Sequence, residues 1–439
     1  MTYHNAVKYI TGAPQKTGVT ESLERTALLA ARLGSPENRL PYIRFAGSNG
    51  KTVCQAMLAS ILCESGMRVG SLLMPSHDSP RENIIINKAP LSIEDTVKYV
   101  SLIAAAVNEL RAEISESAES GALSSLPESF ASGKVSVAPT KNEIIFLMAL
   151  LAFRDAECDI CLIEGDHNGV DPTKLLAPPR TAVICGTIPE ENTKETHRIR
   201  SYLSNGITEV ISAPQDSETY KLISSACARI NCRLSVPTKS LLEITRLSLG
   251  GSEFIYRGDK YKLGAPGRFQ IHNAITVIEA VRSLNRSGKT IPHEAVCRGL
   301  STLSAPTKFE TLSVSPTIII DSTHKTEAVP TMCDTLADFK EQTGTSLVLC
   351  ISPDAPLIEE YASCLSRLGF EIAEIILPLT DKAPMPELEL NCPITALTTA
   401  KATAKKIISS SGEHGLVLVT APDTLANKLR SEILGILGF

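Results

Sequence analysis

No run of apolar residues in the 439-residue chain is long enough to cross a bilayer. The longest, Ile144–Phe153, has ten residues, whereas a membrane-spanning helix needs about 20. The start of the chain lacks a basic segment followed by an apolar one, so we expect no signal peptide and no membrane association. There is no Gly-X-Y repeat, which excludes a collagen. The net charge of −5 gives no basic excess, so we expect no nucleic-acid partner.

The composition is that of an ordinary globular protein. Hydrophobic residues make up 43% and charged residues 21% of the chain, which excludes a mostly disordered protein. A length of 439 residues predicts two or three domains. The twelve cysteines lie mostly in apolar segments, where free thiols behave as small hydrophobic groups. This usage predicts a reducing compartment, and we expect a cytoplasmic protein.

One C-x-x-C motif runs from Cys158 to Cys161 and continues into Leu162 and Ile163. We predict that it is part of a strand, in which residues three apart point to opposite faces. A core strand is therefore favoured over a redox or metal site.

Strand-like and helix-like segments alternate along the chain. β-rich runs are found at Tyr42–Ala46, Val69–Met74, Ile160–Ile163, Ala182–Cys185, Glu209–Ile211, Thr317–Ile320, Leu347–Ile351 and Leu416–Val419. Amphipathic stretches between them include Val53–Ser65, Ile93–Ala112, Tyr220–Ile230 and Ala274–Leu284. Apolar strands that alternate with helices predict an α/β fold with parallel sheets covered on both faces.

Two segments interrupt this alternation. Ser115–Val135 is rich in Ser, Glu, Ala and Gly, and we predict a long exposed loop or a partly disordered insert. A helix over Pro292–Leu303 is followed by two predicted strands within Lys308–Asp321. We therefore place a domain boundary between them and expect domains of residues 1–303 and 304–439.

The most specific local motif is Ala46-Gly47-Ser48-Asn49-Gly50-Lys51-Thr52. It follows a predicted strand and precedes a predicted helix. Gly47 and Gly50 allow a tight turn whose N–H groups face phosphate oxygens, and the helix N-terminus adds positive charge. Lys51 is suited to reach terminal phosphates, and the Thr52 hydroxyl is suited to hold Mg²⁺. Phe45 stands where the strict G-x-x-x-x-G-K-[ST] pattern has its first Gly, but nucleotide binding is favoured over a chance Asn-Gly turn.

This loop resembles the A-G-T-N-G-K-[TG] loop of the Mur ligase superfamily. Other segments resemble one branch of it, the folylpolyglutamate and dihydrofolate synthases. The matching segments are Met57–Leu62 with Gly66–Gly70, Pro75–His77, Arg81–Ile84 with Ile86-Asn87 and Leu91-Ser92, Thr140 with Glu143, Cys161–Gly165, Asp171–Thr173, Gly267–Ala274, Pro306–Glu310 and Asp321–Lys325. They extend over nearly the whole chain in the family's order.

The resemblance implies a P-loop ATPase domain of the Mur ligase central-domain type and a C-terminal Rossmann-like α/β domain, with ATP between them and Mg²⁺ as cofactor. The implied substrates are a folate or pteroate, glutamate and ATP, and we expect a monomer. Gly47, Ser48, Asn49, Gly50, Lys51 and Thr52 would bind the phosphates. Glu164 would join Thr52 on the metal. Gln270 and Asn273 would lie beside the adenine, Lys308 would support the phosphates, and Asp321 and His324 would reach the nucleotide. His77 would line the substrate cleft, and Lys51, Glu164 and His324 would be the catalytic residues.

The implied chemistry explains this set of residues. A carboxylate is a poor electrophile, and transfer of the γ-phosphoryl group turns it into an acyl phosphate that an amine can attack. Lys and Mg²⁺ are needed because several anionic groups must come together. Closure of a second domain would exclude the water that hydrolyses an acyl phosphate.

Three departures from the family's pattern leave alternatives open. In the family an Asp-His pair, whose His ligates a metal, stands where this chain has Thr187–Glu191. Glu190, Glu191 or His197 are therefore the remaining candidates for this metal ligand. Leu203–Ile207 lacks the family's carbamylated Lys, and Thr420-Ala421-Pro422 replaces a G-S turn. The principal prediction is a ligase that adds glutamate to a reduced folate. The alternatives are a dihydrofolate synthase, a ligase of another acid, and a nucleotide-binding paralogue without ligase activity.

Several candidate residues also have a purely structural interpretation. Lys51 or Lys308 could be a solvated lysine, Glu164 or Asp321 could cap local structure, and His77 or His167 could lie in an exposed turn. The strand-end positions of Glu164 and Asp321 favour a site, because ligands bind at the carboxyl ends of strands in open α/β sheets.

Overall fold

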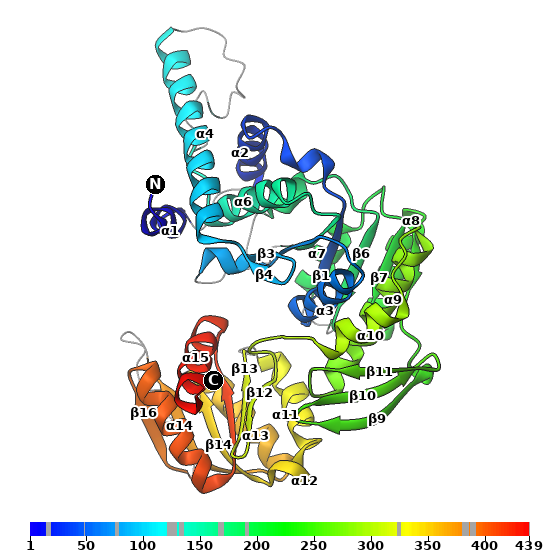
Figure 1. Cartoon of the computed structure of the whole chain (residues 1–439), viewed down its shortest axis with the longest axis vertical. Helices are drawn as coiled ribbons and strands as arrows, with labels where there is room; N and C mark the ends of the chain where they lie inside the picture. Colours follow the sequence, from blue (N-terminus) through cyan, green and yellow to red (C-terminus); the bar gives the residue numbers. More distant parts are fainter. Residues whose placement is uncertain are drawn as a thin grey trace. The chain divides into compact units, whose positions relative to one another are not determined.

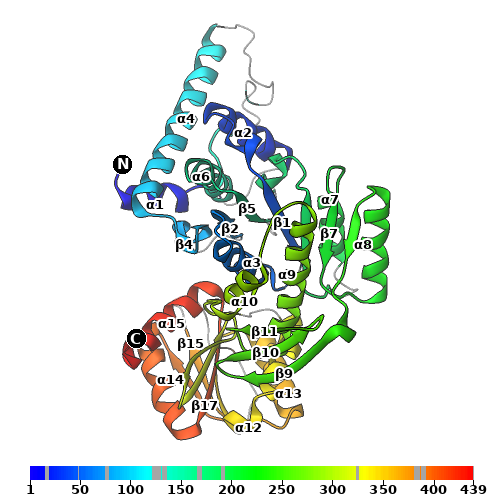
Figure 2. The same ribbon diagram turned by 45° about the vertical axis from the view of Figure 1, so that its right-hand side comes forward.

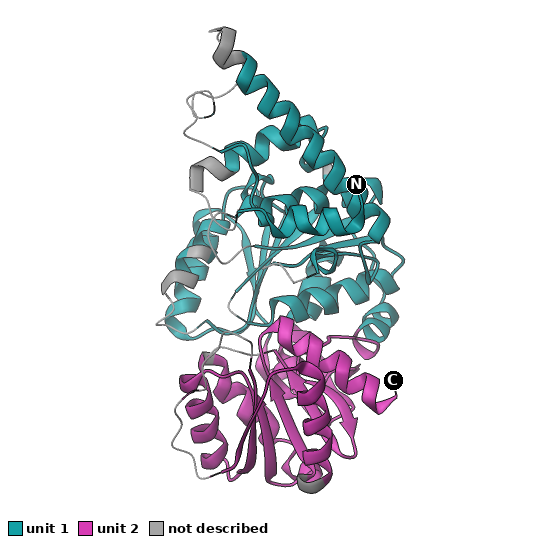
Figure 3. Cartoon of the chain, turned by 90° about the vertical axis from the view of Figure 1, so that its left-hand side faces the viewer, with its two compact units in different colours: residues 1–237, 276–299 teal, residues 238–275, 300–439 magenta. Residues whose placement is uncertain are grey.

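The computed structural model describes residues 1–14, 19–47, 49–74, 79–120, 130, 136–165, 171–188, 193–322, 326–379, 386 and 392–438. The chain forms two compact units (Figure 3). One contains residues 1–237 and 276–299, and the other contains residues 238–275 and 300–439. The predicted domain boundary at residues 303 and 304 stays a prediction. Among the helices of the described ranges, none has both the length and the apolar character needed to cross a membrane.

The first unit is built on an eight-stranded sheet in the order β4-β3-β2-β5-β1-β6-β7-β8. The strands β2, β5, β1, β6, β7 and β8 are parallel, and β3 and β4 extend the sheet in antiparallel pairing. The strand bounds are β1 Tyr42–Gly47, β2 Val69–Leu72, β3 Ile84–Ile86, β4 Ala89–Pro90, β5 Ile160–Glu164, β6 Thr181–Cys185, β7 Glu209–Ser212 and β8 Arg233–Ser235. The prediction of a parallel α/β sheet is confirmed.

The helices that lie wholly or mostly in this unit are α1 Tyr3–Thr11, α2 Val19–Arg32, α3 Lys51–Glu64, α4 Ile93–Ser120, α6 Lys141–Asp155, α7 Thr193–Tyr202, α8 Ser217–Arg229 and α10 His293–Ser301. Helices α1, α2, α4 and α6 share one apolar core with β2 and β5, and Figures 1 and 2 both show α4 beside α6. Helices α7 and α8 pack on β6 and β7 through a second core. α6 begins at a capping box, in which Thr140 and Glu143 satisfy each other's backbone N–H groups.

The second unit contains a six-stranded sheet in the order β12-β13-β17-β14-β15-β16. Its strands are β12 Glu310–Val314, β13 Thr317–Asp321, β14 Ser346–Ile351, β15 Glu371–Pro378, β16 Ile394–Leu397 and β17 Leu416–Thr420. β12 forms an antiparallel hairpin with β13, and the other pairs are parallel. Helices α11 Val329–Ala337 and α13 Ala355–Arg367 belong to the core on one face, and α14 Ala400–His414 and α15 Asp423–Leu437 belong to the core on the other. A short helix, α12, occupies Lys340–Thr343.

The second unit also has an antiparallel three-stranded sheet, β9 Leu242–Ser248, β10 Gly251–Tyr256 and β11 Asp259–Leu263 (Figure 2). The alternating strand-and-helix pattern did not predict it. Helix α9, Arg268–Arg286, follows it, and its residues belong to both compact units.

One local prediction is wrong in part, and another is confirmed. Helix α4 continues through Ser115 to Ser120, because Glu and Ala favour helix even where no apolar face is needed. The rest of the predicted loop lies almost entirely outside the described residues. The prediction that the C-x-x-C segment belongs to the core is confirmed, because Cys158 and Cys161 are both buried in the same apolar core. Strand β5 begins only at Ile160, so the alternation rule does not reach Cys158.

Candidate functional site

The phosphate loop lies between the central strand β1 and the N-terminus of α3. Gly50 caps this helix with φ of 78°, and no side chain hydrogen-bonds to the first turn at the cap. The N–H groups of the first helical turn have no carbonyl partner within their own helix and are suited to meet an anion. Ser48 lies outside the described residues.

Gly47 closes β1 with φ of 119°, a conformation that L side chains rarely adopt. A Cβ atom at this position would stand 2.1 Å from the Cys185 carbonyl oxygen on the neighbouring strand β6. A Cβ at Gly186 would likewise stand 2.7 Å from the Asn49 carbonyl oxygen. Glycine is therefore needed on both sides of this contact. The role of Gly186 was missed from the sequence, although a glycine that follows a predicted strand was a usable signal.

Glu164 meets the loop from the end of β5, which pairs with β1 so that Glu164 lies opposite Phe45. Its Oε1 lies 3.6 Å from Lys51 Nζ, and its Oε2 accepts a hydrogen bond of 3.4 Å from the Thr52 hydroxyl. Lys51 Nζ also donates to the Gly47 carbonyl at 2.7 Å. Lys51 and Glu164 are 5% and 2% exposed, so each charge is compensated by the other in a buried place.

A hydroxyl and a carboxylate therefore converge next to the phosphate loop. Oxygen donors of this kind suit a hard cation such as Mg²⁺. Thr52 and Glu164 are accordingly the side chains that fit a magnesium ion. Within the described ranges, no three His, Cys, Asp or Glu side chains form a metal-binding group.

The buried thiol of Cys185 lies beside this loop. Burial raises its pKa well above the ordinary value, and a hydrogen bond with Cys54 adds to the effect. Cys185 therefore stays protonated and has a structural role here.

A polar cluster fixes the segment that follows Glu164. The Tyr202 hydroxyl donates to Asp171 Oδ2 at 2.6 Å, and the Arg44 guanidinium lies 3.6 Å from the same oxygen and 4.7 Å from the centre of the Tyr202 ring. A Cβ atom at Gly165 would stand 2.6 Å from the Tyr202 hydroxyl. The cluster thus leaves room only for glycine directly after Glu164. Arg44 and Tyr202 were not predicted as contributors, because both are distant in sequence from the segment that follows Glu164.

In the second unit, four predicted site residues form one connected group. Asn273 Nδ2 donates to Gln270 Oε1 at 3.0 Å, and Gln270 Nε2 donates to the Lys308 carbonyl at 3.2 Å. The next backbone N–H, that of Phe309, donates to Asp321 Oδ2 at 2.7 Å. The structure therefore brings together residues that are up to 51 positions apart in the sequence.

The Lys308 ammonium has partners that the sequence did not predict. Its Nζ donates to Asp423 Oδ1 at 2.8 Å and to the Ser322 hydroxyl. Ser322 directly follows β13, and Asp423 is the first residue of α15 after β17. Both therefore lie at carboxyl ends of adjacent parallel strands, the edge of the sheet where polar site residues gather. Asp423 could have been recognised from its place after a predicted strand.

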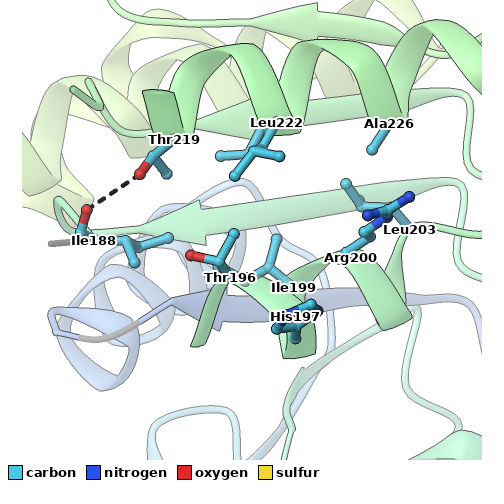
Figure 4. A pocket seen from close by; sticks show the side chains of 10 residues that line it. Ile188, Thr196, His197, Ile199, Arg200, Leu203, Thr219, Leu222 and Ala226 are labelled. Carbon is cyan, nitrogen blue, oxygen red and sulfur yellow. Dashed lines mark hydrogen bonds between the residues drawn. The ribbon is translucent and has the colours of Figure 1, made fainter. Parts of the chain in front are cut away.

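Several predicted residues lie outside the described residues, namely His77, His167, Glu190, Glu191 and His324. His197 is described and lines a cavity of about 200 Å³ between α7 and α8 (Figure 4). Arg200 and Leu203 line the same cavity, and Thr219 closes one end by donating a 3.4 Å hydrogen bond to the Ile188 carbonyl. None of the lining residues belongs to the phosphate loop.

Comparisons with known proteins identify the relatives of this chain. The dihydrofolate synthase/folylpolyglutamate synthase of Mycobacterium tuberculosis is 25% identical over 358 residues, which is 76% of this chain and 70% of that protein. The folylpolyglutamate synthase structure from Thermotoga maritima has a TM-score of 0.75 at 21% identity, covering 98% of this chain and 96% of the other. The chain resembles folylpolyglutamate and dihydrofolate synthases. The resemblance to folylpolyglutamate and dihydrofolate synthases that the motifs indicate is confirmed, although the sequence identity to these relatives is low.

A third comparison concerns the ligand state of a relative. The Mycobacterium tuberculosis folylpolyglutamate synthase structure, solved with ADP and AMPPCP, has a TM-score of 0.73 at 19% identity and covers 94% of this chain and 95% of the other. These structural likenesses show a shared fold, and the predicted pair of α/β domains is confirmed. No protein-family model matches the chain.

Proposed function

We propose that this protein is an ATP-dependent ligase that adds L-glutamate to a reduced folate, with ADP and phosphate as the other products. The observation that carries the proposal is the contact of the buried Lys51 and Glu164 with each other and with the partly buried Thr52 at a strand–loop–helix junction. The activity itself is that named for the relatives. ATP and Mg²⁺ are the proposed cofactors.

Lys51 is proposed to bind the terminal phosphates of ATP. In the structure its ammonium is held by Gly47 and Glu164, so it is already placed at the loop. Binding of phosphate would supply it with further acceptors. When it is bound, Mg²⁺ supplies positive charge that neutralises the phosphates and favours phosphoryl transfer. Thr52 and Glu164 would hold it.

The residues of the second unit are proposed to contribute to the same reaction. Gln270 and Asn273 would contact the adenine, and Lys308 and Asp321 would contact the phosphates and ribose region. His324 is proposed as a catalytic residue, and His77 is proposed as a substrate contact. The hydrogen bonds that join Gln270, Lys308 and Asp321 support a common role.

The proposed reaction has two steps. The γ-phosphoryl group moves to the folate carboxylate and ADP leaves, which produces an acyl phosphate. The glutamate amine then attacks the acyl carbon, the amide forms, and phosphate departs with the bonding electron pair. A positive charge at Lys51 would stabilise the negative charge that develops on the transferring phosphoryl group.

Dihydrofolate synthase activity is a second candidate, because a relative is named for both activities. It would use a pteroate in place of the folate. A nucleotide-binding protein without ligase activity is a third, because Leu203–Ile207 has no lysine. We also propose a cytoplasmic, monomeric protein, and the twelve free cysteines support a reducing compartment.

The test is ADP release with ATP and Mg²⁺, using tetrahydrofolate plus glutamate or dihydropteroate plus glutamate. The proposal expects release that depends on both the folate and glutamate, together with a product heavier by one glutamyl residue. Lys51→Ala should abolish nucleotide binding and activity. Lys98→Ala removes an exposed ion pair with Asp155 and serves as the matched control, with activity unchanged.

Each result discriminates among the candidates. Turnover of dihydropteroate alone would support the dihydrofolate synthase alternative. Nucleotide binding that Lys51→Ala abolishes, without amide formation from either acid, would refute the ligase proposal and favour the binding paralogue.

A further inference from the structure

The cavity between α7 and α8 has an apolar inner wall. On one side, Ile199 lies on α7 and Leu203 directly follows that helix. On the other side, α8 contributes Ile223 and Ala226. All four side chains are at most 5% exposed and belong to the apolar core that α7 and α8 share with β6 and β7. Burial of an apolar group against this wall is therefore favourable.

The mouth of the cavity combines an apolar side chain with basic ones. Leu222 on α8 is 47% exposed, although it is a large hydrophobic residue. His197 and Arg200 are exposed on α7, where a spacing of three residues places them on the same side of the helix. Figure 4 shows Leu222 extending from α8 toward the side chains of α7. A ligand that covers Leu222 would therefore lie beside the two basic groups.

Arg200 and His197 have donors available for a ligand. Within the ranges that the structure describes, neither side chain has an ion pair or a hydrogen bond with another residue. Lys221 on α8, by contrast, is paired with Glu218 at 2.7 Å. The described residues that line the cavity include no Asp or Glu. Because an arginine side chain stays positively charged in proteins, the mouth of the cavity favours an anion.

The size and the lining of the cavity restrict the anion that it can hold. One water molecule takes about 30 Å³ of liquid volume, so a cavity of about 200 Å³ has room for about six or seven groups of that size. A folate is far larger. A doubly charged phosphate would bring two charges next to an apolar wall, where Arg200 supplies one permanent positive charge. A single carboxylate on a short hydrocarbon chain matches both the inner wall and the mouth.

We propose that this cavity is an accessory binding site for small monocarboxylates with a short branched hydrocarbon chain, such as isovalerate. The chain would pack against Ile199, Leu222 and Ile223. The carboxylate would accept two hydrogen bonds from the planar guanidinium of Arg200, a pairing that matches carboxylate geometry, and His197 would donate a further one. None of these residues belongs to the proposed nucleotide site, so the inference goes beyond the proposed function.

The experiment measures the binding of isovalerate to the full chain by isothermal titration calorimetry, without ATP, Mg²⁺ or folate. Isovaleramide is the matched control ligand, because it has nearly the same shape and no charge. We expect isovalerate to bind with a Kd of about 1 mM or tighter. Isovaleramide should bind about ten- to a hundredfold more weakly, because the charge-assisted hydrogen bonds to Arg200 are lost. The result does not depend on the ligase proposal, since no substrate of that reaction is present.

Three variants locate the site. Arg200→Gln should weaken isovalerate binding by about ten- to a hundredfold and leave isovaleramide binding unchanged. Arg229→Gln removes the same charge from an exposed position of α8 outside the cavity lining, and it should bind isovalerate like the wild type. Ala226→Leu places a larger side chain in the cavity and should abolish the binding of both ligands.

The comparison of ligands on the wild-type chain tests the proposal even if Ala226→Leu fails to fold. Equal affinity for isovalerate and isovaleramide would overturn it, because Arg200 would then not hold the carboxylate. An equal loss of affinity in Arg200→Gln and Arg229→Gln would also overturn it, since surface charge in general would be the cause. So would the absence of saturable isovalerate binding up to about 10 mM, or inorganic phosphate that binds as tightly as isovalerate.

Discussion

Replacing Gly47 with alanine tests the geometry of the phosphate loop most directly. The new Cβ would stand 2.1 Å from the Cys185 carbonyl oxygen, and an ordinary contact begins at 3.4 Å. The oxygen would have to retreat by about 1.3 Å, although it belongs to β6, which pairs with β1 at this point. Overpacking of this kind costs about 1–3 kcal/mol. The positive φ adds about 1–3 kcal/mol of backbone strain for a non-glycine residue.

We therefore expect Gly47→Ala to lower the free energy of unfolding by about 2–6 kcal/mol, a large share of the ~5–15 kcal/mol that a folded protein has. The displaced loop should also lose its affinity for nucleotide. Gly66→Ala is the matched control. Gly66 has φ of 87°, and a Cβ atom added there would meet nothing within 4 Å, so this variant should show only a conformational cost of about 1–2 kcal/mol.

The assay is urea unfolding of both variants, combined with titration of a fluorescent ATP analogue in the presence of Mg²⁺. An equal loss of stability in the two variants, with nucleotide affinity retained in Gly47→Ala, would refute the reasoning. It would mean that the loop relaxes away from Cys185 without penalty.

Three further outcomes follow from contacts in the first unit. Glu143→Gln leaves the fully buried Arg25 guanidinium without its carboxylate partner at 2.9 Å, so urea unfolding should show a loss of about 3–5 kcal/mol. Tyr202→Phe removes the 2.6 Å hydrogen bond to Asp171 and should cost about 1.5–3 kcal/mol in the same assay. Burial raises the pKa of Glu209, but hydrogen bonds from Ser283, Ser235 and Arg286 lower this pKa by more, so that it lies below the ordinary value of 4.5. The ionised Glu209 therefore stabilises the fold above pH 4.5, and this stabilisation is lost as the pH falls through the lowered pKa.

Each outcome has its own control. Glu218→Gln removes an exposed ion pair with Lys221 and should change stability by less than about 1 kcal/mol. If it costs as much as Glu143→Gln, burial is not the cause. Tyr99→Phe removes a longer, 3.3 Å bond to Asp155 and should cost less than Tyr202→Phe. Glu209→Gln should flatten the fall in unfolding free energy below pH 4.5, and an unchanged profile would show that Glu209 does not contribute.

The parts of the site that depend on local chain order were predictable from the sequence. A glycine-rich turn between a strand and a helix has few alternatives, and Lys51 and Thr52 follow it directly. Glu164 was predictable because it ends an apolar strand, and adjacent parallel strands bring their carboxyl ends to one edge of the sheet.

Contacts between distant segments were not predictable in the same way. Asp423 lies 115 positions from Lys308, and no local pattern pairs them. The C-x-x-C segment lies in the core as predicted, but β5 begins only at Ile160, after the left-handed residue Glu157, so that the strand includes Cys161 and not Cys158. The sheet of β9, β10 and β11 was not predicted although Gly250-Gly251 and Arg257-Gly258 mark its two turns, because consecutive hairpin strands do not fit a pattern of strands that alternate with helices.

The two edge strands of the eight-stranded sheet, β4 and β8, affect whether copies of this protein can pair through their sheets. β4 contains two residues and ends in Pro90, which has no N–H to donate, and β8 contains three residues. A strand of another copy could form few backbone hydrogen bonds with β4 or β8, because both edge strands are short. In β4, Pro90 also removes one of the N–H donors. The short edge strands and Pro90 thus disfavour aggregation by edge-to-edge strand pairing, independently of any surface charge.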